Sequence, residues 1–358
     1  MEKIRISGVQ LSILIMGFLL GVIINPSAIA RQDAWIVHIL AWASSFGLLT
    51  IYLTIARLNP NKTLVQILKN TFGKYIGGLI SLLYIWYFIH LAAIVTLSFG
   101  GFAAITVYTQ TPGIFINICS GLVLIYGLRS GLEVIARAVE VTIPMVLVLM
   151  VLITLIMIPD FNINNILPMM KQGMTPIMKG LFSNVTFPFG ELVVFLMIFP
   201  FVNKKSQIHK YSYIGLGIIG FITLLTIVRD LMILGPDMVY RLIFPFTVVA
   251  KLFPISIAPI ILFYNLVGLG VKVGILIYAA SLGIAQVFNL EEFKPFIIPL
   301  VIFNLALSEW LYNSIIEGLR WSNKYYAFYA LPFQVIIPLI LLVISFIKYK
   351  KTKKETGN

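Results

Sequence analysis

Long apolar runs separated by short clusters of charge constrain this chain more than any other feature of its sequence. The hydrocarbon core of a bilayer is crossed by a helix of roughly 20 apolar residues. Because a bilayer offers no water to the backbone, only helices and closed barrels satisfy their polar groups there. A barrel would show alternating segments of about ten residues, whereas these runs are continuous. The sequence therefore predicts an all-α integral membrane protein.

Ten runs of spanning length can be counted. They lie near residues 9–30, 35–56, 76–107, 113–128, 134–158, 180–202, 211–234, 252–289, 295–316 and 325–347. The limits of the fourth and eighth stay open, and Pro254 and Pro259 predict a re-entrant start to the eighth. Ala28-Ile29-Ala30 resembles a signal-peptidase site, but the preceding apolar run is longer than most signal cores. We expect it to remain as the first span.

Basic residues are distributed unequally between the two sets of loops. With the amino terminus inside, 17 of the 26 Lys and Arg residues fall on the cytoplasmic side and 8 outside, with Lys272 left within a span. Cytoplasmic loops carry the excess of positive charge in membrane proteins. Both termini are therefore predicted to be cytoplasmic, including the basic tail at 348–358.

The ten predicted spans divide into two groups of five. A first repeat near 9–158 and a second near 180–347 would lie in opposite orientations, within a single transmembrane domain covering 1–358. Each group opens with an interrupted helix, and paired interruptions are typical of a mid-membrane binding site in an inverted-repeat transporter fold. The predicted fold is thus a 5+5 inverted repeat, LeuT-like, with broken first and sixth helices.

The sixth run contains the clearer interruption. Pro188 removes a backbone donor and clashes with the preceding turn, and Gly190 adds conformational freedom. Glu191 places an ionisable group within the membrane, where such residues are costly and usually functional. The interpretation we favour is a segment that lines a site. The alternative is a Pro-kinked packing helix with Glu191 near one end.

Broken helices expose N–H groups at one new end and carbonyls at the other, which suits the carboxylate and ammonium of an amino acid. The first break contains Gly21, Asn25 and Pro26, and the second runs from Phe187 to Gly190. Asn25-Pro26 is equally well interpreted as an outer helix end followed by a turn.

Three further side chains are candidates for the ligand site. Glu191 would face a ligand ammonium, take a proton or bond neighbouring backbone. Lys272 would either fill the place of a sodium ion or extend its ammonium to the interface. Tyr84 would wall the cavity or pack among aromatic rings.

Other functional classes find no support in the sequence. The net charge of +13 suits nucleic acid, but topology explains it, so no nucleic-acid partner is predicted. Cys119 lies alone in an apolar run and the three histidines show no ligand spacing. We therefore expect no metal site, and the chain shows no cofactor-binding or catalytic motif.

Several motifs resemble a known family. They are Gly21…Pro26 followed by Gln32-Asp33-Ala34-Trp35-Ile36, Leu167-Pro168…Gly173 leading to Pro188-Phe189-Gly190-Glu191, Tyr278 to Gly283 with Gln286 to Leu290, and Pro295…Pro299. Their order and spacing resemble the B subunits of GerA-type spore germinant receptors, in the amino acid/polyamine/organocation transporter superfamily.

The resemblance implies a nutrient-sensing subunit in the spore inner membrane, in complex with A and C subunits and binding a small amino acid or similar nutrient. Transport would be vestigial. A proton- or sodium-coupled amino-acid permease is the alternative.

The charge distribution leads to a labelling test of topology. In a chain whose Cys119 is replaced, single cysteines at Ser206 and Thr352 should resist an impermeant reagent added outside, whereas one at Asn165 should react. Reaction at 206 from outside would contradict the ten-span topology.

Overall fold

The computed structural model describes residues 5–22, 24–253, 257–312 and 314–355. In these ranges the regular structure is helical, apart from one parallel bridge between Ile6 and Val202. The principal helices are α1 (Gly8–Leu20), α2 (Ala34–Leu58), α3 (Leu64–Thr106), α4 (Gly113–Ser130), α5 (Leu132–Ile156), α6 (Met174–Thr186), α7 (Gln207–Leu234), α10 (Ala258–Val287), α11 (Ile297–Trp310) and α14 (Ile337–Glu355).

Shorter elements connect or complete these helices. They are η1 (Pro26–Asp33), η2 (Ile158–Asp160), η3 (Ile163–Ile166), η4 (Phe189–Met197), η5 (Phe199–Phe201), α8 (Pro236–Arg241), α9 (Pro245–Ala250), η6 (Lys294–Phe296), α12 (Ile315–Trp321), η7 (Ser322–Tyr326), α13 (Ala327–Leu331) and η8 (Pro332–Ile336). Of these, η7 and η8 are π-helical and the other η elements are 3₁₀ helices.

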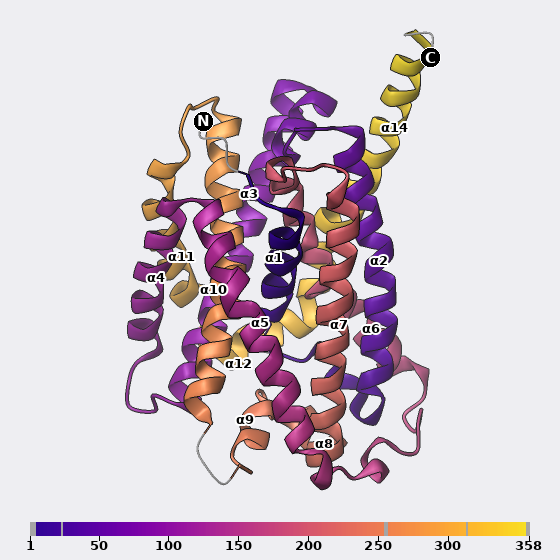
Figure 1. Ribbon diagram of the computed structural model, residues 1–358, viewed down its shortest axis with the longest axis vertical. Coiled ribbons are helices and arrows are strands. Elements are labelled where there is room, and N and C mark those ends of the chain that lie inside the picture. Colours follow the sequence, from indigo (N-terminus) through magenta and orange to yellow (C-terminus); the bar gives the residue numbers. More distant parts are fainter. Residues whose placement is uncertain (1–4, 23, 254–256, 313, 356–358) are drawn as a thin grey trace.

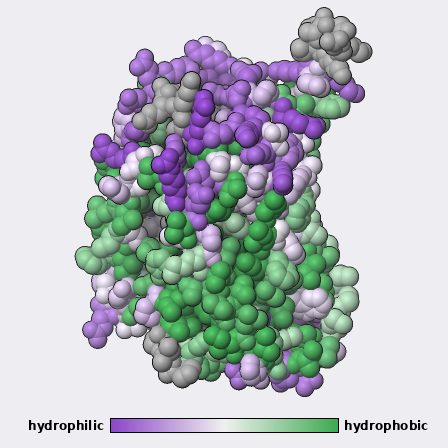
Figure 2. Space-filling view, in the orientation of Figure 1, coloured by the Kyte–Doolittle hydropathy of each residue, from purple (hydrophilic) through white to green (hydrophobic). Residues whose placement is uncertain are grey.

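The helices form a bundle whose two chain ends lie at the same end, opposite α8 and α9 (Figure 1). Hydrophobic residues cover the middle of the face in Figure 2, with hydrophilic residues gathered beyond them. Eight helical segments of the described residues are long and apolar enough to cross a membrane, and α1 is a shorter apolar helix. The chain is thus a multi-pass membrane protein, while the count of ten spans stays a prediction.

The helix of the third predicted span begins at Leu64, before the predicted start at 76, so part of the connection between the second and third spans is helical. Thr63 and Gln66 form a capping box that starts α3 at Leu64, and such reciprocal bonds satisfy two helix-end donors. The chain then bends at Gly73, whose φ is 81°. The capping pattern is visible in the sequence, but the polar composition of the segment masks it.

The eighth, ninth and tenth predicted spans also differ from their predicted limits. The ninth ends at Trp310, and helical structure resumes at Ile315 and runs to Glu355, so the expected tail is partly helical. The eighth begins at Ala258 as one continuous helix with Pro259 in its first turn, where a missing N–H costs nothing. No re-entrant piece occurs from 257 onward, and Pro254 lies outside the described residues.

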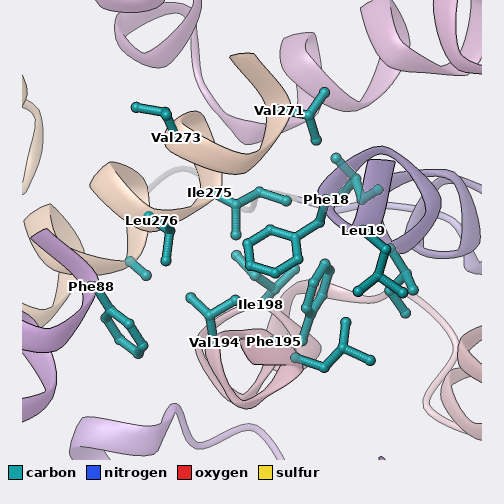
Figure 3. Packing of buried hydrophobic residues seen from close by; sticks show 14 of the residues in the cluster. Phe18, Leu19, Phe88, Val194, Phe195, Ile198, Val271, Val273, Ile275 and Leu276 are labelled. Carbon is teal, nitrogen blue, oxygen red and sulfur yellow. The ribbon is translucent and has the colours of Figure 1, made fainter. Parts of the chain in front are cut away.

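The two interrupted helices lie at the centre of the bundle. Phe18 of α1 meets Phe195 of η4 edge-to-face, with ring centroids 5.5 Å apart, and α10 supplies Ile275 beside them (Figure 3). At the end where the termini lie, Ile6 donates its N–H to Phe201 and accepts from Asn203, at 3.0 and 2.9 Å. These two bonds hold the segment before α1 against the end of η5.

The bend in α3 leads to a paired substitution test. Gly73 lies in open space, so Gly73→Ala meets no neighbour but forces a side chain into a backbone region that only glycine favours. We expect a loss of about 1–3 kcal/mol in the free energy of unfolding. Gly78→Ala, also in open space but in regular helix, should be neutral or stabilising by roughly 0.5–1 kcal/mol. Equal effects on unfolding in detergent would argue against the bend.

Candidate functional site

The first break separates α1 from η1. The Gly21 N–H closes α1 by bonding the carbonyls of Gly17 and Phe18 at 3.2 and 3.3 Å. Helical structure resumes after Asn25, whose Oδ1 accepts from the Ser27 N–H at 3.0 Å, with Pro26 in the first helical turn. An Asn cap followed by Pro is a strong helix start. The predicted interruption is therefore present, with its limits set by Gly21 and Asn25.

The second break lies between Thr186 and Phe189. The α6 helix ends at Thr186, the Phe187–Pro188 peptide is cis, and η4 follows. Gln334 Nε2 donates to the Thr186 carbonyl at 2.9 Å. Backbone groups freed within a membrane need partners supplied by the protein, and here a distant side chain provides one. The predicted interruption of helix six is therefore present as well.

Tyr52 of α2 connects the second break with η8 near the end of the chain, and Tyr84 of α3 also bonds η8. The Tyr52 hydroxyl lies 3.1 Å from the Gly190 carbonyl and 2.7 Å from that of Gln334. The Tyr84 hydroxyl donates to the Phe333 carbonyl at 2.6 Å. Gln334 and Phe333 belong to η8, one of two π segments, and π turns inside helices often mark functional positions. Sequence reasoning missed Tyr52 and Gln334, which carry no periodic signal.

A fully buried ion pair joins η4, which follows the second break, to α10. Glu191 Oε2 lies 2.6 Å from Lys272 Nζ, and both side chains are 0% exposed. The ammonium also lies 4.6 Å from the ring centroid of Phe187 and 5.3 Å from that of Phe18. Ring faces attract cations, so the charge is stabilised on several sides. Glu191 and Lys272 each stand out in the sequence, but no sequence pattern predicts that they meet.

A chain of hydrogen bonds leads from this pair to α3 and to the π segments η7 and η8. The Tyr326 hydroxyl donates to Glu191 Oε1 at 2.6 Å. It lies 3.0 Å from the Tyr87 hydroxyl, which in turn accepts from Gln334 Nε2 at 2.7 Å. Each hydroxyl can accept one bond and donate the next, so all bonds are compatible. A connected buried network of this kind favours one arrangement of the helices.

Two cavities adjoin the breaks. The smaller, of about 30 Å³, is lined by residues including Gly21, Pro26, Phe187 and Tyr326, and has roughly the volume of one water. The larger, of about 130 Å³, lies toward α9, the end opposite the termini. Its lining includes Asn25, Pro26 and Pro188.

The remaining predicted residues line neither cavity. Tyr84 and the Glu191–Lys272 pair belong to the network. A side chain on Gly190 would collide with Gln334, and one on Gly21 would meet Lys272 and the Gly268 carbonyl. In the structure both glycines therefore permit close helix packing.

Sequence and structure comparisons give a consistent result. The family described as "Spore germination protein" matches residues 5–314. Spore germination protein KB of Bacillus subtilis (strain 168) is 31% identical, over 100% of this chain and 99% of that protein. Spore germination protein YndE of the same organism is 25% identical, over 97% of each.

Two solved transporters share the fold. Mhp1, a nucleobase-cation-symport-1 family transporter in a closed conformation with bromovinylhydantoin bound, has a TM-score of 0.72 at 13% identity, covering 95% of this chain and 78% of that one. A Na⁺-coupled sialic acid symporter in a substrate-bound outward-open state has a TM-score of 0.66 at 11% identity, covering 90% and 76%. These likenesses confirm the LeuT-like fold class.

The buried pair predicts strong energetic coupling. Glu191→Gln or Lys272→Met alone leaves one charge buried without its partner, which should cost about 3–5 kcal/mol in the free energy of unfolding. The double variant buries no unpaired charge and should recover most of that loss. A titration with denaturing detergent in mixed micelles measures all three.

The exposed pair between Glu133 and Arg137, also 2.6 Å apart, provides the control. Breaking it should change the free energy of unfolding by only roughly 0.3–0.5 kcal/mol. Additive losses in the Glu191/Lys272 double variant would mean that the two charges do not pair.

Proposed function

The chain belongs to the spore germination protein family, and from this membership we propose that it is the nutrient-germinant-sensing membrane subunit of a spore germination receptor. The chain is a non-enzymatic membrane protein of transporter fold. Its ligand would be a small amino acid or similar nutrient, held at mid-membrane between broken helices one and six. A and C receptor subunits would be its partners, in the inner membrane of the spore with both termini cytoplasmic.

The meeting of the two helix breaks carries this proposal. Gly21, Pro26 and Phe187, from the two breaks, line one cavity, and Asn25 and Pro188 line the next. Non-helical backbone at membrane depth is tolerated where it is buried or lines a cavity. Side chains from α2 and η8 already bond two backbone carbonyls at the second break. The polar groups of the breaks that face the cavities remain available to bind a ligand.

The Glu191–Lys272 pair supports sensing without ion coupling. In this proposal the Lys272 ammonium supplies, as a fixed part of the chain, the positive charge that a bound sodium ion would otherwise bring. It extends from α10 to α1, the second break and η4, against Phe18, Phe187 and Glu191. A covalently attached cation cannot be carried across the membrane, so it would hold the helices together without driving transport.

The alternative function is a proton- or sodium-coupled amino-acid permease. The likeness in fold to two transporters favours it, although fold alone does not determine function. The two functions differ in the step after binding. A permease concentrates its ligand inside vesicles when an ion gradient is imposed, whereas a sensor binds the ligand and passes the change to its partners.

We expect the purified chain in proteoliposomes to bind nutrient, equally in sodium and choline buffers, and to show no concentrative uptake. Thr226→Phe should weaken binding at least about tenfold, because Thr226 lines the larger cavity and a ring there would occupy the ligand's space. A tenfold change corresponds to about 1.4 kcal/mol. Binding of labelled nutrients measures the first effect and vesicle uptake the second.

Ile218→Phe is the matched control. Ile218 lies on α7 like Thr226, is 41% exposed and does not line the cavity, so binding should not change. Sodium-dependent concentrative uptake would favour the permease. Unchanged binding in Thr226→Phe would remove the larger cavity from the ligand site.

A further inference from the structure

A second buried ion pair lies within α7. Arg229 Nε and Nη2 donate to Asp230 Oδ1 at 2.9 and 2.7 Å, and the two residues are 5% and 8% exposed. Arg229 is one of the eight basic residues assigned to the outer side, although the predicted seventh span already includes it, and in the structure it lies buried within α7. Ionisable residues within membrane helices face a cavity or a partner, and usually have a function. The network around Glu191 does not include this pair.

Among the described residues, the pair leaves one nitrogen atom of Arg229 and one oxygen atom of Asp230 without a hydrogen bond. Both hydrogen bonds end on Asp230 Oδ1, so Asp230 Oδ2 and Arg229 Nη1 have no hydrogen-bond partner within the described part of the chain. Neither atom is among the completely buried side-chain atoms that lack a partner. The two residues therefore offer a negatively charged acceptor and a positively charged donor side by side.

Both residues line the larger cavity beside the helix breaks. A cavity of about 150 Å³ holds benzene, a molecule of six non-hydrogen atoms, so the 130 Å³ observed here suits a ligand of about that size. His38 also lines the cavity, but its Nε2 already lies 3.0 Å from the Gly220 carbonyl and 3.1 Å from Thr223 Oγ1. Arg229 and Asp230 thus dominate the electrostatics of the lining.

We propose that the Arg229–Asp230 pair recognises a zwitterionic amino acid of about six non-hydrogen atoms, with the ligand carboxylate on Arg229 Nη1 and the ligand ammonium on Asp230 Oδ2. A zwitterion and an internal ion pair are each neutral overall, so their union brings no net charge into the membrane. Each new contact is a charge-assisted hydrogen bond, the stronger kind. This assignment rests on the proposed function and specifies the class of its ligand.

Three probes of similar size separate the two charges of the ligand. L-Alanine carries both, L-alaninamide lacks the carboxylate, and propionate lacks the ammonium. For the purified chain in proteoliposomes we expect alanine to bind at least about tenfold more tightly than either analogue. The double variant Arg229→Gln/Asp230→Asn removes both charges together and leaves polar side chains in their place, and it should lose this preference while remaining folded. The control Glu133→Gln/Arg137→Gln, which removes an exposed pair on α5, should keep it.

The possible results distinguish this inference from the proposed function. Preference for alanine that disappears only in the α7 double variant supports the assignment. Equal preference in the wild-type chain and the α7 variant overturns it. Binding of an uncharged nutrient such as glucose, with no binding of alanine, also overturns it but leaves the proposed function standing. Failure of the wild-type chain to bind any nutrient overturns both.

Discussion

The cost of burying charge in a membrane governs the centre of this protein. Glu191 and Lys272 are both fully buried, and neither would be tolerated there alone. Their pairing requires η4 and α10 to approach closely. A side chain at Gly21 would meet Lys272, and one at Gly268 would meet the backbone of Leu20 and Gly21, so small residues permit helix one to approach as well. The need to pair these two buried charges thus fixes the relative positions of α1, η4 and α10.

The π-helical backbone of η8 depends on side chains from the same central region. Where η8 departs from α-helical bonding, Tyr52 and Tyr84 bond the carbonyls of Gln334 and Phe333. Gln334 itself reaches across to Thr186 at the break of helix six. Irregular segments of two helices therefore satisfy each other's backbone, and a change at one alters the hydrogen bonds of the other. Mutual satisfaction of this kind makes an irregular membrane helix stable and also couples its parts.

The sequence predicted the membrane fold and both helix breaks, because span length, proline, glycine and isolated charge are local signals. Glu191 and Lys272 stood out singly for the same reason. Their pairing could not be predicted, since it joins residues far apart in sequence and depends on helix packing. The roles of Tyr326 and Gln334 carry no local signal at all. Arg229 lies in the predicted seventh span and was counted as an outer charge because it is near the end of that span, and its burial with Asp230 was not predicted.

The arrangement of the two cavities bears on how a bound nutrient would act. Ile24 and Pro26 line both of them, so the break of helix one separates the larger cavity from the smaller. Tyr326, which bonds Glu191, lines the smaller. A ligand shifts a conformational equilibrium only by the difference in its affinity for the two states. A nutrient in the larger cavity would gain part of that difference from the segment around Pro26, which on its other side lines the smaller cavity together with Tyr326. A movement of this short segment would therefore act on Tyr326, and through it on the Glu191–Lys272 pair, without contact between the ligand and the pair.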